Sequence, residues 1–249
     1  MNVALAISHL RTRKGLAGAG LVLVAGVGLV LGALISTDRP SAPMPVLAED
    51  PVRHGGSELY VQKFEVTVAE WNACHEAGGC SLRLRVPTGK AAAATPATGL
   101  NHDDVDEYID WINRGTGQEF RLPTVAEWKA MAAPILAEAR EPTFDQPSLS
   151  WASRYITENN APRALKPQGS FSETPEGIAD LDGSVWEWTQ DCYGGEAGGN
   201  LTAAKCMAYW AAGEHDAALA YMIRDPARGG CAVGTPPAHL GMRLVTDSQ

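Results

Sequence analysis

The segment from Gly177 to Trp188, GIADLDGSVWEW, places the tightest constraint on what this chain can fold into. It carries three carboxylates, on Asp180, Asp182 and Glu187, around Gly183, a residue that lets a backbone turn tightly. Oxygen ligands grouped in this way suit a hard cation such as calcium. The alternative is an acidic surface turn closed by two core tryptophans, and the spacing taken alone favours that alternative.

Four other motifs follow one another in a fixed order along the chain. They are Glu65–Thr67 (EVT), Asp104–Trp111, Arg121–Ala132 (RLPTVAEWKAMA) and Gly241–Leu244 (GMRL). Together with the acidic turn they resemble the sulfatase-modifying-factor family, whose founder is the formylglycine-generating enzyme. The resemblance covers about residues 58–247. It implies a C-type-lectin-like variant with unusually little regular secondary structure.

Local patterns predict few helices and several short strands. Thr67 with Glu70, and Thr124 with Glu127, have the spacing of capping boxes and predict two helix starts. A third helix is expected from an amphipathic pattern, and alternation of apolar and polar residues predicts a strand. Such a mixture with long loops indicates an α+β domain. The expected helices span about 68–76, 103–113 and 125–133, and the expected strands about 59–68, 184–188 and 242–245.

The N-terminal part differs in kind from the rest. Residues 15–35 form an uncharged apolar run, long enough for a helix across a bilayer, and only basic charges precede it. We therefore expect residues 1–14 in the cytoplasm, a transmembrane anchor or uncleaved signal at 15–35, a Pro/Ser/Ala-rich linker at 36–57 and the folded domain at 58–249. A cleaved signal peptide with a late site near Ala48 is the alternative. This arrangement predicts a single-pass protein of the bacterial inner membrane, with its C-terminal domain in the periplasm or outside the cell.

The formal net charge of -9 limits the classes of partner. Nucleic acids and anionic membrane surfaces require a basic face. We therefore expect no nucleic-acid binding, and contact with the membrane only through the N-terminal helix. The expected partner is a protein or peptide.

Five cysteines follow the apolar run, in the part expected outside the cytoplasm, where disulfides form. Cys74 and Cys80 bracket a short flexible loop and are predicted to pair. Cys192 and Cys206 flank a glycine-rich excursion and form the next pair. Cys231 is then odd, and is either free or exchanges with one of those two.

The resemblance also implies a catalytic chemistry that these cysteines do not match. The formylglycine-generating enzyme binds copper(I) through two cysteines near its C-terminus and oxidises a substrate cysteine with oxygen. Soft thiolates suit copper(I). In this chain no cysteine stands where either ligand is expected, so copper is not expected and the catalytic residues stay unknown. Cys206 and Cys231 are the remaining weak candidates.

Two sets of site residues follow from the resemblance. The family's structural calcium site falls on the side chains of Asp180 and Glu187 and on the main-chain carbonyls of Gly183 and Val185, so a structural calcium ion is expected. A cleft that binds a peptide, a glycan or a partner protein is expected near Trp210, Arg224, Asp225 and His239. For His239 the alternative is a surface histidine without a binding role.

Function is therefore expected to be binding rather than oxidation. The leading hypothesis is a membrane-anchored extracytoplasmic domain that acts as a non-copper accessory or binding protein. Residues 229–237, GGCAVGTPP, are similar to a segment in bacterial family members found beside copper nitrite reductases, which implies a periplasmic redox enzyme as partner. The alternative is a formylglycine-generating oxidase that acts on a cysteine of a substrate protein. A structural domain on the cell surface without a small ligand is a third reading.

Overall fold

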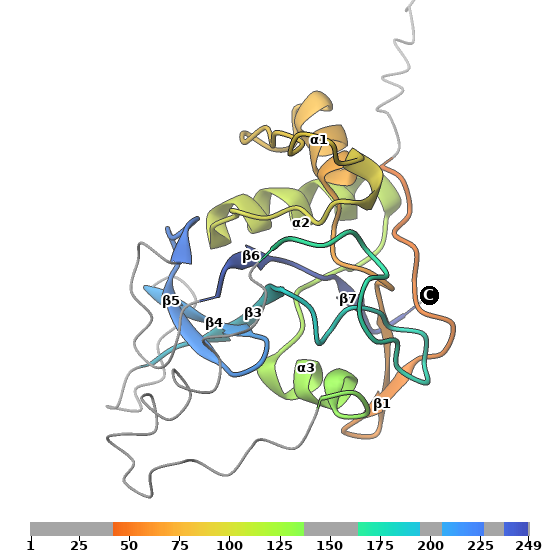
Figure 1. The fold of residues 1–249 in the computed structure, drawn as a ribbon. Helices are drawn as coiled ribbons and strands as arrows, with labels where there is room; N and C mark the ends of the chain where they lie inside the picture. The colour runs from red at the N-terminus through yellow and green to blue at the C-terminus, as the bar shows by residue number, and fades with distance from the viewer. Residues whose placement is uncertain (1–41, 137–163, 195–205, 227–236, 249) are drawn as a thin grey trace, which may run out of the picture. The chain divides into compact units, whose positions relative to one another are not determined.

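The structure is a computed structural model, and it describes residues 42–136, 164–194, 206–226 and 237–248. All of them belong to one compact unit, residues 38–249. This unit combines three α-helices with short strands and long connections, which confirms the predicted α+β class (Figure 1). The α-helices are α1 (Val68–Glu76), α2 (His102–Thr116) and α3 (Val125–Ala132), and one 3-10 helix, η1, spans Ala92–Ala94.

Each α-helix begins with a capping box. Thr67 and Thr124 accept the backbone N–H groups of the glutamates three residues later, as predicted, and those glutamates accept the N–H groups of the two threonines in return. Helix α2 has a box that the sequence analysis missed, made by Asn101 and Asp104. This box starts α2 one residue earlier than predicted, and Gly117 ends it in the left-handed conformation that glycine favours.

Seven strands form two sheets in the described residues. The smaller sheet has the order β1-β2-β7, and the larger has the order β5-β4-β3-β6, in which only the β3–β6 pair is parallel. Parallel pairing places residue 185 beside residue 239, so the acidic turn enters the sheet next to the C-terminal segment. The strands are β1 (Val52–His54), β2 (Ser57–Val61), β3 (Val185–Cys192), β4 (Ala208–Ala212), β5 (Ala217–Ala220), β6 (His239–Gly241) and β7 (Val245–Thr246).

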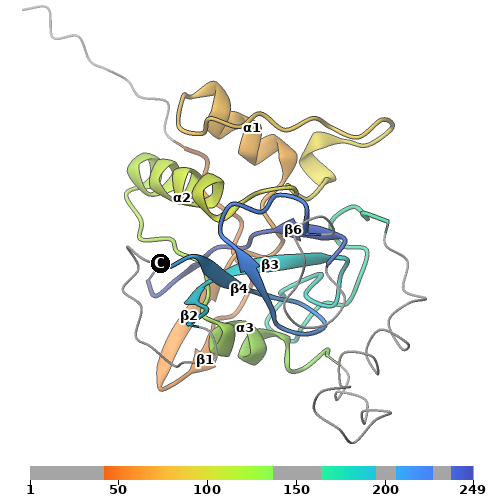
Figure 2. The same ribbon diagram turned by 90° about the vertical axis from the view of Figure 1, so that its left-hand side faces the viewer.

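The larger sheet separates two hydrophobic clusters. Helix α2 lies on one side of it and α3 on the other (Figures 1 and 2). Trp186, Trp188 and Tyr209 belong to the cluster that includes α2, whereas Ala212 belongs to the cluster that includes Trp128 of α3. Because side chains alternate along a strand, neighbouring residues of β3 and β4 face different clusters.

The folded domain begins before the predicted boundary at residue 58. Within the expected linker, residues 42–57 pack onto the domain: β1 pairs with β2, and Ala42, Ala48 and Val52 are buried. The prediction of a linker is therefore wrong for these residues. Their apolar side chains are too widely spaced to show a period in the sequence, although each one contacts the core.

The predicted transmembrane segment, residues 15–35, lies outside the described residues. Among the residues that are described, no helix combines the length and the apolar character that crossing a bilayer requires.

All three predicted strands differ in extent from the observed ones, and the strand expected at 184–188 continues to Cys192 as β3. The strand expected at residues 59–68 ends at Val61, and the chain then runs as a loop into the cap of α1. The strand expected at 242–245 is split, because β6 ends at Gly241 and β7 starts at Val245. Arg243 lies in this interruption, and its side chain is completely buried.

Candidate functional site

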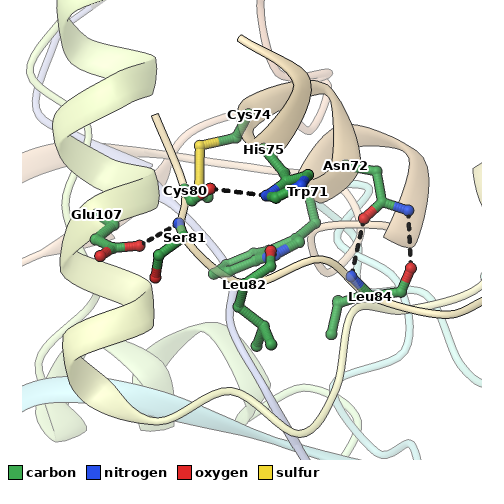
Figure 3. Close-up of a disulfide and its surroundings, with 9 residues drawn as sticks. All are labelled: Trp71, Asn72, Cys74, His75, Cys80, Ser81, Leu82, Leu84 and Glu107. Carbon is green, nitrogen blue, oxygen red and sulfur yellow. Dashed lines mark hydrogen bonds between the residues drawn. A yellow bond between two sulfur atoms is a disulfide. The ribbon is translucent and has the colours of Figure 1, made fainter. Parts of the chain in front are cut away.

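Both predicted disulfides are present. The Cys74–Cys80 bridge closes the end of α1 onto the next segment, where Trp71, Asn72 and Glu107 hold the chain by hydrogen bonds (Figure 3). The second bridge joins Cys192 at the end of β3 to Cys206. Disulfides such as these hold irregular segments in place in regions that have few backbone hydrogen bonds.

The second bridge decides the state of one catalytic candidate. Because the sulfur of Cys206 is bonded to Cys192, Cys206 is not a free thiol in this structure. Cys231, the other candidate, lies outside the described residues. A copper-binding pair of Cys206 and Cys231 would thus require the Cys192–Cys206 bond to be reduced first.

Asp180, in the acidic turn, uses its carboxylate to fold the preceding loop. The two oxygens accept the backbone N–H groups of Gly169 and Phe171, at 2.5 and 2.8 Å. Asp180 itself has a φ of 66°, and its carbonyl accepts the N–H of Gly183. A Cβ on Gly183 would lie 2.6 Å from that carbonyl oxygen, which explains the glycine. Asp182 binds the N–H and hydroxyl groups of Ser172 instead.

Glu187 lies at the centre of a buried ion pair. Its carboxylate accepts the indole N–H of Trp128 at 2.8 Å and faces Nε and an Nη atom of Arg243 at 3.0 and 2.8 Å. The side chains of Glu187 and Arg243 are 1% and 0% exposed. The other guanidinium N–H groups of Arg243 donate to three main-chain carbonyls, those of Gln62, Lys63 and Ala179. One guanidinium thus ties together the residues that follow β2, the acidic turn, β3 and the C-terminal segment.

A second buried carboxylate, Glu65, faces the same arginine at a longer distance. Its Oε2 atom is 3.9 Å from Arg243 and has no hydrogen-bond partner among the described residues. The pKa of Glu65 is raised to about 8: burial raises it most, Arg243 lowers it, and the Glu187 and Asp180 carboxylates raise it. Burial alone would lower the pKa of Arg243, but Glu187 and Glu65 outweigh that effect and raise it. Glu65 is the member of this group that can hold a proton near neutral pH.

These contacts test the predicted calcium site. Both predicted carboxylates, Asp180 and Glu187, direct their oxygens to protein N–H donors, and Arg243 already balances the charge of Glu187. Calcium takes six to eight oxygen ligands. A cation bound between these two side chains would have to replace donors of a fully buried arginine. The donor set does not fit calcium in this arrangement, and the Gly183 and Val185 carbonyls alone do not make a site.

The predicted cleft residues do not form one cluster. Arg224 lies on the α2 side of the larger sheet, where its guanidinium binds the Asp104 carboxylate through two contacts of 2.7 Å. Trp210 occupies the strand position that alternates to the α3 side, and its ring meets Tyr193 edge-on at 5.1 Å. His239 stands opposite Val185 in β6, at a position that alternates to the α3 side as well. Asp225 is exposed next to Arg224.

The α2 side presents a polar face that the sequence analysis found only in part. We name it the α2 face, and it consists of His102, Asp104, Asp106, Tyr209 and Arg224. The His102 ring stacks on Tyr209 at 3.6 Å, and its Nδ1 atom lies 3.5 Å from Asp106. Burial raises the pKa of Tyr209, and nearby aspartates on α2 add to the effect. The hydrogen bond to Asp104 raises the pKa of Arg224, so this arginine keeps its charge.

The sequence analysis missed two members of the buried charged group that Glu65, Glu187 and Arg243 form. It assigned no function to the motifs that contain Glu65 and Arg243. Glu65 belongs to the EVT motif and Arg243 to the GMRL motif, and both motifs entered the prediction only as marks of the resemblance. A charged residue inside an otherwise apolar strand pattern is the signal that points to burial with a partner. The residues of the α2 face left no such signal, since they come from segments more than a hundred residues apart.

Comparison with known proteins supports the family. The model of the sulfatase-modifying factor enzyme 1-like domain matches residues 17–248. Two relatives are named serine/threonine-protein kinase pkn1, from Chlamydia pneumoniae and Chlamydia caviae, and are 31% and 28% identical over 114 and 102 residues. These stretches are 46% and 41% of this chain but 16% and 15% of the relatives, so the chain spans only a small part of their length.

A solved structure supports the fold. PvdO from Pseudomonas aeruginosa superposes with a TM-score of 0.51 at 17% identity, over 81% of this chain and 90% of that one. At this level of identity the likeness concerns architecture alone. The family model covers nearly the whole chain, including all of the motifs in the buried centre and on α2. The chain belongs to the family of sulfatase-modifying factor enzyme 1-like domains.

Proposed function

We propose that this protein is a non-copper accessory or binding member of its family, anchored to the bacterial inner membrane by residues 15–35, with the domain held in the periplasm or outside the cell. Its partner is a protein or peptide. The similarity of residues 229–237 to members found beside copper nitrite reductases favours a periplasmic redox enzyme as that partner.

The state of the cysteines is the observation that carries the proposal. The chain has five cysteines, and the two disulfides occupy four of them. Cys231 is the one cysteine outside these two bridges, whereas a copper(I) site of the family type needs two thiolates. The disulfides also suit an oxidising compartment, in agreement with an extracytoplasmic location.

The α2 face is the proposed contact surface. Arg224 keeps its charge and is 51% exposed on its side chain, while Asp104 beneath it is 3% exposed and fixes its direction. Met207 and Met222 are exposed beside it at the ends of β4 and β5, where Tyr221 donates its N–H to the Met207 carbonyl. A fixed charge beside flexible apolar side chains is suited to a protein surface.

Thiol counting tests the proposal directly. The full chain in non-ionic detergent is unfolded in denaturant without reductant and titrated with a thiol reagent. We expect one reactive thiol per chain, and no stoichiometric copper(I) binding in competition with a chromogenic chelator. A chain with a C231S substitution should then give none.

The alternative oxidase has a different signature. Three thiols in the unreduced chain, together with one tightly bound copper(I), would contradict the accessory role. Conversion of a cysteine in a peptide to formylglycine, measured by mass spectrometry, would establish the oxidase instead.

A further inference from the structure

The strongest unassigned surface is a basic ridge, which we define as residues 81–90, SLRLRVPTGK. It follows the Cys74–Cys80 bridge and passes along α1 (Figure 3). Leu82 and Leu84 are half-buried and pack against the core, whereas Arg83 and Arg85 are exposed. This alternation is the pattern of extended backbone with one face on the protein and one in solvent.

One edge of the ridge is held by side chains that stand in for a neighbouring strand. Asn72 of α1 donates to the Leu84 carbonyl and accepts the Leu84 N–H, both at 3.0 Å. The indole of Trp71 donates to the Leu82 carbonyl at 2.8 Å. Since alternate residues of extended backbone direct their polar groups to the same edge, these contacts fix the edge of residues 82 and 84 toward α1.

The opposite edge is open. Among the residues that the structure describes, the main-chain N–H and C=O groups of Arg83 and Arg85 have no hydrogen-bond partner. The guanidinium groups of these two arginines and the ammonium of Lys90 also have no ion-pair partner there. A chain with a net charge of -9 thus presents two exposed arginines on one face of the ridge, next to an unpaired edge that α1 and a disulfide keep in position, with Lys90 after the turn that follows.

We propose that the basic ridge binds an extended acidic segment of a partner protein, which adds to it as a strand. The main-chain groups of Arg83 and Arg85 would pair with that segment. Their side chains, two residues apart on one face, would bind carboxylates spaced two residues apart in the partner. The recognised chemistry is an alternating acidic sequence in extended conformation. This surface is separate from the α2 face, and the proposal does not depend on the Cys192–Cys206 bridge or on Cys231.

The open edge favours a peptide over a lipid surface. Main-chain donors and acceptors recognise another backbone, and lipid headgroups offer no matching row. An anionic membrane would also meet the carboxylates of α2, where Glu107 binds the N–H of Ser81 at the start of the ridge. Three cations surrounded by a net negative protein are weakly attracted to such a membrane.

The test uses the full chain in non-ionic detergent and a fluorescein-labelled peptide, Ser-Glu-Val-Glu-Val-Glu-Ser. Fluorescence anisotropy is expected to show saturable binding that weakens about tenfold in the R83Q/R85Q double variant, because two charge-assisted contacts are lost. The matched control is R53Q, which removes another exposed arginine, from β1. This variant should bind as the wild type does. A peptide with glutamine in place of glutamate, and one with N-methylated alternate amides, should both bind more weakly.

Three results with the peptide would overturn the proposal, and a fourth result would come from vesicles. One is R83Q/R85Q binding the peptide as the wild type does, and another is R53Q weakening it equally, since either would mean that the ridge has no specific role. The third is equal binding of the N-methylated peptide, which would mean that charge alone acts. A preference for vesicles of phosphatidylcholine and phosphatidylserine over the peptide, lost in R83Q/R85Q, would assign the ridge to a membrane surface instead. All the substituted side chains are exposed, and a thermal unfolding curve checks that each variant folds.

Discussion

Two arginine–carboxylate pairs, one on each side of the larger sheet, use the same chemistry in different surroundings. On the α3 side, Arg243 and Glu187 are 0% and 1% exposed, and every guanidinium nitrogen has a partner. On the α2 side, Arg224 is 51% exposed and binds Asp104 from the solvent side. The contact distances of the two pairs are nearly equal, so distance does not distinguish them.

The difference lies in what water can do for each pair. Water can solvate Arg224 if Asp104 is lost, but it cannot reach Arg243. Loss of either partner of the buried pair therefore destabilises the fold strongly. The exposed pair, in contrast, can break and re-form around a partner. Within this comparison, the α3 side is the structural half of the domain and the α2 side is the half suited to recognition.

The largest effect is expected from Arg243→Met. This change leaves Glu187 and Glu65 buried without a positive charge and leaves three main-chain carbonyls without a donor. We expect a loss of about 3–5 kcal/mol in the free energy of unfolding. Urea unfolding followed by tryptophan fluorescence measures it. A loss below about 1 kcal/mol would mean that the buried pair contributes no more to stability than an exposed pair does.

Two substitutions that replace a carboxylate by the corresponding amide, one in each pair, test the comparison. Glu187→Gln leaves a buried guanidinium without a counter-charge and should cost about 3 kcal/mol. Asp104→Asn leaves Arg224 free to turn into water and should cost about 1 kcal/mol or less. Both changes keep the shape of the side chain. Equal losses in chemical denaturation would contradict the assignment of structural and recognition halves.

Glu65 makes the stability of the α3 side depend on pH. Its pKa is raised from 4.5 to about 8, so the folded state binds a proton that the unfolded state releases at lower pH. This contribution to stability is complete below pH 4.5 and is lost as the pH rises through about 8. In that window the free energy of unfolding should fall by up to about 1.4 kcal/mol per pH unit. The Glu65→Gln variant should lack this slope. If the wild type and the variant gave parallel profiles of stability against pH, Glu65 would not be the source of the slope.

The smallest effect on folding is expected from Arg224→Gln. The arginine is half-exposed, and Asp104 keeps its hydrogen bond from the N–H of Asn101 in the helix cap. The free energy of unfolding should fall by about 1 kcal/mol or less. Differential scanning calorimetry can detect the accompanying shift in melting temperature. A loss as large as that of the Arg243 variant would make the α2 face structural rather than a recognition surface.

The sequence predicted those parts of the fold that local chemistry decides. The capping boxes of Thr67 and Thr124 placed the starts of α1 and α3, because a cap involves residues three apart. Both disulfides were predicted from short separations, six and fourteen residues. The α+β class followed from the same local patterns.

Contacts between distant segments were not predictable in this way. Arg243 bonds to the carbonyls of Gln62 and Lys63, about 180 residues earlier, and Arg224 bonds to Asp104 across 120 residues. No periodic pattern encodes such pairs. The predicted calcium ligands illustrate this limit. The acidic turn is a local pattern that the sequence shows, but the buried arginine that faces Glu187 lies 56 residues further along the chain.

The long sequence separation between Arg243 and its partners has a consequence for folding during synthesis. Its guanidinium joins segments that leave the ribosome much earlier, from Gln62 to Glu187. Until Arg243 has left the ribosome, Glu187 and Glu65 lack this cation, and a chain that stops short of residue 243 would have to bury both carboxylates without it. Closure of the polar interior is thus a late step in folding, which waits for a residue far along the chain from its partners.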